Sequence, residues 1–134
     1  MIQFLLRTIL ACCLLGSAAA SAASSAEQDD NAIRETVRLY LHGTSFNVQD
    51  EIKQAFHTTA RLYLDGKNDT EWELSGPEYA KLFSPETIGQ FNGRHGRLIK
   101  VDVSGKVATA KAEIHIPQQG VRYVDVFLLK KIAG

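Results

Sequence analysis

The stretch that decides the fold is Tyr123-Val-Asp-Val-Phe-Leu-Leu-Lys-Lys-Ile132, close to the end of the printed sequence. Both of its alternating faces are apolar, and it is rich in β-branched and aromatic residues, which is typical of a central strand. It carries one carboxylate, Asp125, on the same face as Tyr123 and Phe127. The sequence allows either face to point inward, because the other face, from Val124 to Leu128, is equally apolar and would leave Asp125 in solvent.

The segments before this strand predict an antiparallel meander. Residues 95–103 and 107–116 each place apolar side chains at every second position, and short polar turns separate them from each other and from the closing strand. An earlier hairpin is predicted over residues 60–74, with its turn at residues 65–69. Together with the closing strand, these segments predict a largely antiparallel sheet.

Helices are predicted ahead of the long strands. Asp29 or Asp30 can cap a first helix, which Gly43 is placed to end, and residues 45–57 predict a second helix. Residues 75–78, Ser-Gly-Pro-Glu, form a capping-box pattern that would open a short third helix. Because each of the two longer helices has a single apolar stripe, we expect an α+β fold in which the N-terminal helices pack on the concave face of a curved antiparallel sheet.

The N-terminus predicts a cleaved signal peptide over residues 1–22. Arg7 comes before an apolar run at residues 8–15, and a tract of small residues follows with small-x-small cleavage patterns. The run is shorter than the roughly 20 residues that span a bilayer, although an uncleaved N-terminal anchor is an alternative. We therefore expect a periplasmic or secreted protein without a stable membrane span, with a short disordered lead at residues 23–28 and one domain over residues 29–134.

Composition excludes several function classes for the mature chain. Both cysteines, Cys12 and Cys13, lie in the signal segment, so the mature domain would have no disulfide, no cysteine nucleophile and no thiolate metal site. Loss of Arg7 leaves 14 basic and 15 acidic residues, and no basic cluster stands out along the sequence. Nucleic acid is therefore not an expected partner.

The order of these elements resembles the nuclear transport factor 2-like superfamily of cone-shaped, cystatin-like α+β domains. The nearer resemblance is to its SnoaL-like and "putative lumazine-binding" members. The segments that carry it are residues 40–43 (Tyr-Leu-His-Gly), 52–62, 93–103 and 123–130. The resemblance implies a pocket between helices and sheet. Such proteins usually continue with a tryptophan-containing strand after the point where this sequence ends, so the resemblance covers a domain that lacks its final strand.

The resemblance also implies which residue types would act in the pocket. Isomerases and dehydratases of this fold use one carboxylate or histidine as a base, with tyrosines as hydrogen-bond donors. A carboxylate among apolar walls becomes a usable base, and a buried tyrosine can stabilise a developing enolate. The candidate catalytic residues are therefore Asp125 and His95 as bases and Tyr40 as donor. His95 lies in the same alternating register as Ile99 and Val101, so we expect it to point toward the helices.

Each candidate also has a structural interpretation. Asp125 could be solvated, His95 could be a core or rim histidine, and Tyr40 could be ordinary core. Aromatic residues could wall the pocket or simply pack. The candidate ligand-binding residues are Trp72, Tyr79, Phe83, Tyr123 and Phe127.

We expect no metal and no cofactor. The remaining histidines are predicted to cap helices or to lie on the surface, and no pair of them has metal-ligand spacing. No phosphate-cradling glycine loop, serine-nucleophile elbow or dinucleotide fingerprint is present.

Two function classes remain. The first is an exported domain that binds a small apolar or aromatic molecule, with cofactor-independent isomerase or lyase proton transfer as its catalytic form. The alternative is a non-catalytic module that forms a homodimer, or binds another protein, through the face of its sheet.

Overall fold

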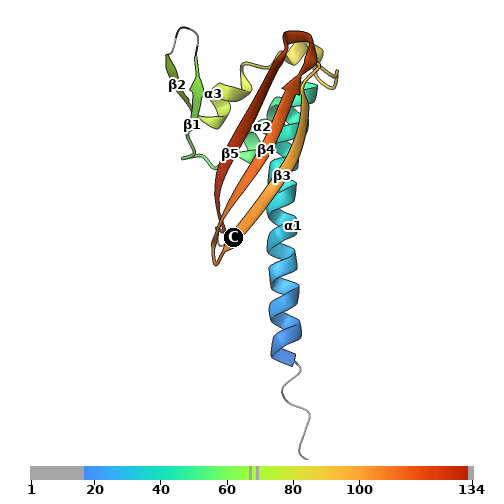
Figure 1. Ribbon diagram of the computed structural model, residues 1–134, viewed down its shortest axis with the longest axis vertical. Helices are drawn as coiled ribbons and strands as arrows, with labels where there is room; N and C mark the ends of the chain where they lie inside the picture. The colour runs from blue at the N-terminus through green and yellow to red at the C-terminus, as the bar shows by residue number, and fades with distance from the viewer. Residues whose placement is uncertain (1–16, 67, 69, 133–134) are drawn as a thin grey trace, which may run out of the picture.

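The computed structural model describes residues 17–132 except 67 and 69, with side chains described from residue 25 onward. Most of the predicted signal peptide, residues 1–16, therefore lies outside the described residues. The predicted α+β class is confirmed: helices are followed by a hairpin, a short helix and three long antiparallel strands (Figure 1).

Helix α1 spans Ser17–Phe46 and is longer than predicted. Its predicted start at Asp29 or Asp30 was wrong: the helix also includes residues 23–28, where we expected a disordered lead. The segment before Asp29 is rich in alanine, the strongest helix former, and has no glycine or proline from Ser17 onward, so helical conformation continues through it. In Figure 1 the N-terminal part of α1 extends well past the end of the sheet.

The C-terminal end of α1 was also predicted wrongly. Gly43 lies within the helix, where its missing side chain makes room for helix α2 (Gln49–Ala55): a Cβ atom there would lie 2.8 Å from Cγ1 of Ile52. The helix ends three residues later, and Asn47 takes the left-handed conformation with φ of 60°. The amide of Val48 then donates to the Gly43 carbonyl over 2.9 Å and closes the helix end.

The loop before the first long strand completes the cap on α1. The amide of Gly89 donates to the Phe46 carbonyl (2.7 Å), and the amide of Asn92 donates to the Ser45 carbonyl (3.0 Å). The Asn92 side chain also donates to the Thr44 carbonyl over 2.8 Å. Because helix-end carbonyls need such partners, these bonds tie the loop to the helix and fix the position of the residues that follow it.

The long sheet is an antiparallel meander of β3 (His95–Ser104), β4 (Val107–Ile116) and β5 (Val121–Lys130). Strand β3 has a bulge between Leu98 and Lys100, which shifts its register against β4.

The bulge overturns the predicted phase of His95. The residue pairs with His115, on the sheet face opposite to the buried Ile114, whereas Val101 pairs with Ala110 on the inner face. The extra residue at Ile99 breaks the strict alternation from which the inward orientation of His95 was predicted, and His95 is exposed.

The inner face of the sheet lies against α1. The helix can approach this face closely because β4 contributes alanines to it. Ala108, Ala110 and Ala112 are buried, and they pair with Leu129, Phe127 and Asp125 of β5. The face of the closing strand that carries Asp125 is therefore the inward one.

The opposite face of β5 points to solvent. Leu128 is 83% exposed, and Val124 and Val126 are also exposed. Among the described residues β5 pairs with β4 alone.

A second layer covers one end of the inner face. The predicted hairpin is confirmed as β1 (Leu62–Asp65) and β2 (Glu71–Leu74), which pair in register. Helix α3 (Gly76–Ala80) begins at the predicted capping box, in which Ser75 and Glu78 bond reciprocally. A Cβ atom at Gly76 would lie 2.7 Å from Cβ of Phe56, so α3 packs closely behind α2 and turns Tyr79 inward.

The buried residues form two groups. Val37 of α1 packs on the alanines of β4, and a second group lies under α2 and α3: Tyr40, Ile52, Tyr79, Ala80 and Ile114. Among the described helices, none combines the length and the apolar character that crossing a membrane requires.

Candidate functional site

The second core group contains a cluster of polar side chains, which we call the inner cluster: Tyr40, Tyr79, Arg94 and Asp125. The Tyr40 hydroxyl donates to Oδ2 of Asp125 over 2.6 Å, and Nη2 of Arg94 donates to the Tyr40 hydroxyl over 3.1 Å. Nη2 of Arg94 also lies 3.7 Å from Oδ2 of Asp125. Four elements that are distant in sequence therefore meet at one hydroxyl group.

The Tyr40 hydroxyl uses its full hydrogen-bonding capacity. A hydroxyl has one donor and two acceptor positions. Its proton goes to Asp125, and its oxygen accepts from Arg94 and from the Tyr79 hydroxyl, which lies 3.3 Å away. This arrangement sets the direction of each bond and makes Tyr40 the centre of the cluster.

Aromatic rings enclose the inner cluster. The Tyr40 ring meets Phe127 at a centroid distance of 5.0 Å and Phe56 at 5.8 Å, both edge to face. Tyr79 stacks on Tyr40 at 6.1 Å and meets Phe83 at 5.4 Å. These rings shield the two tyrosines from water and strengthen the electrostatic interactions that they make.

Burial changes the acidity of both tyrosines. Desolvation is the main reason that the pKa of the Tyr40 hydroxyl lies well above its ordinary value of 10.0, and the nearby Tyr79 and Asp125 raise it further while Arg94 opposes them. The pKa of Tyr79 is also raised, again mainly by burial. Both hydroxyls therefore stay protonated at neutral pH and act as hydrogen-bond donors.

Two members of the inner cluster reach solvent. The Asp125 side chain is 25% exposed and the Arg94 side chain is 14% exposed, whereas both tyrosines are buried. Nε of Arg94 is buried and has no hydrogen-bond partner among the described residues. Buried donors without partners are uncommon in folded proteins and mark a place where a further polar group can bind.

The structure brings most of the sequence candidates together. Asp125 and Tyr40 are bonded directly, and Tyr79, Phe83 and Phe127 surround them.

The other three candidates lie apart from that contact network. Tyr123 lies on the inner face of β5 and is 46% exposed. Trp72 faces Leu64 across the hairpin, with its indole nitrogen beside Gly66. His95 lies on the opposite face of the sheet and meets the ring of Phe91 at 4.9 Å.

Sequence reasoning missed Arg94 as a site residue. The signal that could have identified it is its place directly before a strand and after the Asn92-Gly93 turn. Gly93 has φ of 90°, a conformation that redirects the chain and turns Arg94 toward the helices. Sequence reasoning also did not select Phe56, whose contact with Tyr40 depends on the packing of α2 against α1.

The inner cluster is chemically suited to binding a neutral polar group. The positive charge of Arg94 and the negative charge of Asp125 balance one another, and the tyrosines are uncharged. A partly exposed carboxylate can accept a proton or a hydrogen bond, and the guanidinium beside it can donate one. Within the described residues no group of three or more histidine, aspartate or glutamate side chains could hold a metal ion.

One protein family and several solved structures are similar to this chain. The family described as "putative lumazine-binding" matches residues 28–134. Searching the curated proteins gives no significant match.

Solved structures with the same fold are labelled NTF2-like proteins of unknown function. One from Shewanella baltica OS155 has a TM-score of 0.66 at 19% identity and covers 78% of this chain and 83% of its own. One from Methylobacillus flagellatus KT has a TM-score of 0.64 at 21% identity, with 78% and 82% covered. One from Silicibacter pomeroyi DSS-3 has a TM-score of 0.64 at 13% identity, with 78% and 85% covered. At these identities the likeness shows the fold.

The raised tyrosine pKa values predict how stability changes at alkaline pH. Above about pH 10 tyrosines ionise in the unfolded chain, while Tyr40 and Tyr79 keep their protons in the folded chain. The folded state then binds more protons than the unfolded state, so the free energy of unfolding falls as pH rises. Urea unfolding at a series of pH values from neutral to alkaline should show this fall, and it should be smaller in Tyr40→Phe.

Tyr63→Phe is the matched control, because Tyr63 is 74% exposed. Its alkaline loss of stability should equal that of the wild type. Equal slopes for wild type and Tyr40→Phe would show that Tyr40 is not buried with a raised pKa.

Proposed function

Because the chain belongs to the "putative lumazine-binding" family within the nuclear transport factor 2-like superfamily, we propose that it binds a small planar molecule at the inner cluster. The observation that carries the proposal is the cluster itself. A guanidinium and a carboxylate, both partly exposed, lie side by side in an aromatic wall on the inner face of the sheet.

The balance of charge favours an uncharged ligand. Because Arg94 and Asp125 neutralise one another, an uncharged ligand would bind without leaving either charge unpaired. It would offer a hydrogen-bond donor to the Asp125 carboxylate and an acceptor to the Arg94 guanidinium, whose buried Nε has no partner among the described residues. Adjacent donor and acceptor groups are found on the edge of heteroaromatic rings that carry amide groups.

The surrounding rings support a planar ligand. Phe83 and Phe127 are partly buried within the core group that contains the inner cluster, and Tyr123 is half-exposed on the same face of β5 as Asp125. Aromatic side chains favour stacked or edge-to-face contact with flat rings. A bicyclic heteroaromatic amide therefore fits both the polar and the apolar parts of the proposed site.

Lumazine, pteridine-2,4-dione, is the probe that tests this proposal. The purified chain should bind it in a calorimetric titration, and Asp125→Asn should weaken binding by about tenfold or more, which corresponds to about 1.4 kcal/mol. The reason is that the asparagine side chain is uncharged and therefore no longer holds Arg94 and Tyr40 in place. Quinoline, a bicyclic ring without the amide edge, should bind more weakly than lumazine to the wild type.

Asp102→Asn is the control for this experiment. Asp102 is an exposed aspartate of β3 on the other face of the sheet, so its replacement makes the same chemical change away from the proposed site. Affinity should remain at the wild-type value in this variant. Binding that is equal in wild type and Asp125→Asn, or absent for lumazine, would overturn the proposal.

Proton-transfer catalysis is the narrower form of this proposal. Asp125 would act as the base, since it is the more exposed member of its pair with Arg94 and its Oδ2 is held by Tyr40. His95 would not act on the same ligand, because it lies on the opposite face of the sheet.

We also propose that the chain is exported. The support is the apolar run at residues 8–15 followed by small residues, which is the pattern of a cleaved signal peptide. Cleavage after residue 22 would shorten α1 at its N-terminal end and leave the inner cluster intact, since Tyr40 lies far along the helix.

A second function, homodimerisation through the sheet, is favoured by the outer face of β5. Val124, Val126 and Leu128 form an exposed apolar row on this strand. Exposed apolar rows of this kind are typical of protein interfaces. Two copies of the chain could bury these rows against one another.

Sedimentation at increasing protein concentration tests the dimer. The wild type should form dimers, and Leu128→Lys should shift the equilibrium strongly toward monomer because it buries a charge in the interface. Ile88→Lys is the control, since Ile88 is also exposed but lies in the loop before β3. A wild type that stays monomeric at high concentration would refute this function.

A further inference from the structure

Strand β5 lies at one edge of the long sheet. Among the described residues it pairs with β4 alone, in an unbroken register from Val121 to Lys130. The strand contains no proline or glycine, and its outer face has no charge between Arg122 and Lys130. Natural proteins usually protect a long apolar edge of this kind, because its free N–H and C=O groups can pair with a further strand.

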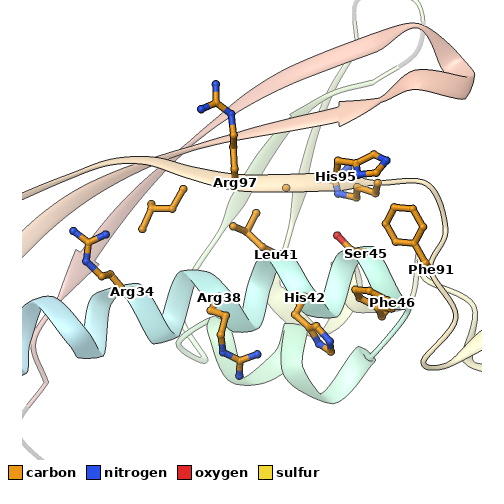
Figure 2. A pocket seen from close by; sticks show the side chains of 12 residues that line it. Arg34, Arg38, Leu41, His42, Ser45, Phe46, Phe91, His95 and Arg97 are labelled. Atoms are coloured by element: carbon orange, nitrogen blue, oxygen red, sulfur yellow. The ribbon is translucent and has the colours of Figure 1, made fainter.

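The opposite edge of the sheet has such protection. Strand β3 has the bulge between Leu98 and Lys100, and its outer face carries the charged pair of Lys100 and Asp102 at 3.6 Å. In Figure 2 the strand runs along α1, and Leu41 points from the helix toward it. A Cβ atom at Gly96 would lie 2.7 Å from Cδ2 of Leu41, so helix and strand pack directly. Strand β5 has neither a bulge nor a charge in the middle of its outer face.

The backbone groups that face the open edge follow from the β4–β5 ladder. Successive residues of an antiparallel strand turn their N–H and C=O groups alternately toward one neighbour and toward the other. The amide of Lys131 donates to the Lys106 carbonyl over 2.8 Å, and this pair continues the register of the two strands. The odd-numbered residues of β5 therefore bond to β4, and the even-numbered residues turn their backbone groups to the open edge.

The even-numbered residues also carry the exposed apolar side chains. Leu128 is 83% exposed, Val126 is 65% exposed and Val124 is 57% exposed. A strand added at this edge would give their backbone groups partners and would place apolar neighbours beside their side chains. Backbone and side chains of the same three residues therefore favour one kind of partner, an extended apolar segment.

We propose that this partner is β5 of a second copy, so that the two three-stranded sheets join edge to edge into one. An antiparallel strand edge is complementary to itself, and a two-fold axis is the commonest symmetry of protein pairs. With the axis at Val126, the outer face places Val124 opposite Leu128 of the second copy. The apolar row then continues from one chain into the other.

Charge separates this register from its neighbours. With the axis at Asp125, the two Asp125 carboxylates would lie directly opposite, and like charges in that position destabilise a sheet. With the axis at Phe127, Val124 would lie opposite Lys130 of the second copy and the apolar row would end. The axis at Val126 instead places Asp125 opposite Phe127 of the second copy.

This contact differs from a dimer formed through the sheet face. Face-to-face contact buries the side chains of the outer face and leaves the edge amides of β5 without strand partners. Edge-to-edge contact gives those amides partners and leaves the outer face of both copies in solvent. The exchange rates of the amides therefore distinguish the two assemblies.

Hydrogen exchange of the full chain, followed by NMR at a low and a high protein concentration, tests the proposal. The amides of Val124, Val126 and Leu128 should exchange at least about tenfold more slowly at the high concentration, because they gain partners only in the pair. The amides of Asp125 and Phe127 are the internal control. They bond to β4 and should be protected at both concentrations.

Val126→Pro removes the amide at the centre of the proposed pair and leaves the bonds to β4 in place. Proline is tolerated on edge strands where its missing N–H would face outward. In sedimentation experiments this variant should associate at least about tenfold more weakly than the wild type. Retained protection of the Asp125 amide would show that it folds.

Val126→Thr is the matched control, because it keeps the amide and the branched side chain while making the outer face less apolar. Its association should stay within about threefold of the wild type. The proposal is overturned if the edge amides stay unprotected at the high concentration, or if they are equally protected at both concentrations. Equal association of wild type and Val126→Pro would also overturn it, as would weaker association in Val126→Thr than in Val126→Pro.

Discussion

The hydrogen bond from the Tyr40 hydroxyl to Asp125 is the interaction on which the rest of the inner face depends. It joins α1 to the closing strand, and the same hydroxyl oxygen accepts from Arg94 and Tyr79. The bond requires the helix to lie close to the sheet. The buried alanines of β4 meet this requirement, because larger side chains between α1 and the sheet would push the tyrosine away from the carboxylate.

Local sequence patterns predicted much of the fold. The hairpin, the capping box at Ser75 and the three long strands follow from alternation and turn chemistry, which act over a few residues. The errors arose where packing overrides local pattern. Gly43 was interpreted as a helix end, but it serves the approach of Ile52, and the left-handed residue that ends α1 is Asn47.

The candidate site was also predictable only in part, because single residues can be selected from local pattern but their contacts cannot. Asp125 stood out as one carboxylate in an apolar strand, and Tyr40 lay on a helix stripe, so each could be selected alone. Their contact spans 85 positions and could not be derived from spacing. The bulge in β3 reversed the face of His95, since a single extra residue changes the side of every residue beyond it. The position of Arg94 after the Asn92-Gly93 turn was visible in the sequence, but its direction toward the helices depends on the positive φ of Gly93.

The loop between α3 and β3 connects the structural and functional features. It caps the end of α1, holds Phe91 beside Phe46, and places Arg94 in the inner cluster. A neutral ligand suits the balanced Arg94–Asp125 pair.

A double-mutant cycle tests most directly whether the Tyr40–Asp125 contact organises the inner face. The cycle compares the unfolding free energies of wild type, Tyr40→Phe, Asp125→Ala and the double variant. A hydrogen bond to a charged, partly buried carboxylate predicts a coupling energy of about 1.5–3 kcal/mol. Additive effects, with a coupling energy below about 0.5 kcal/mol, would contradict the account.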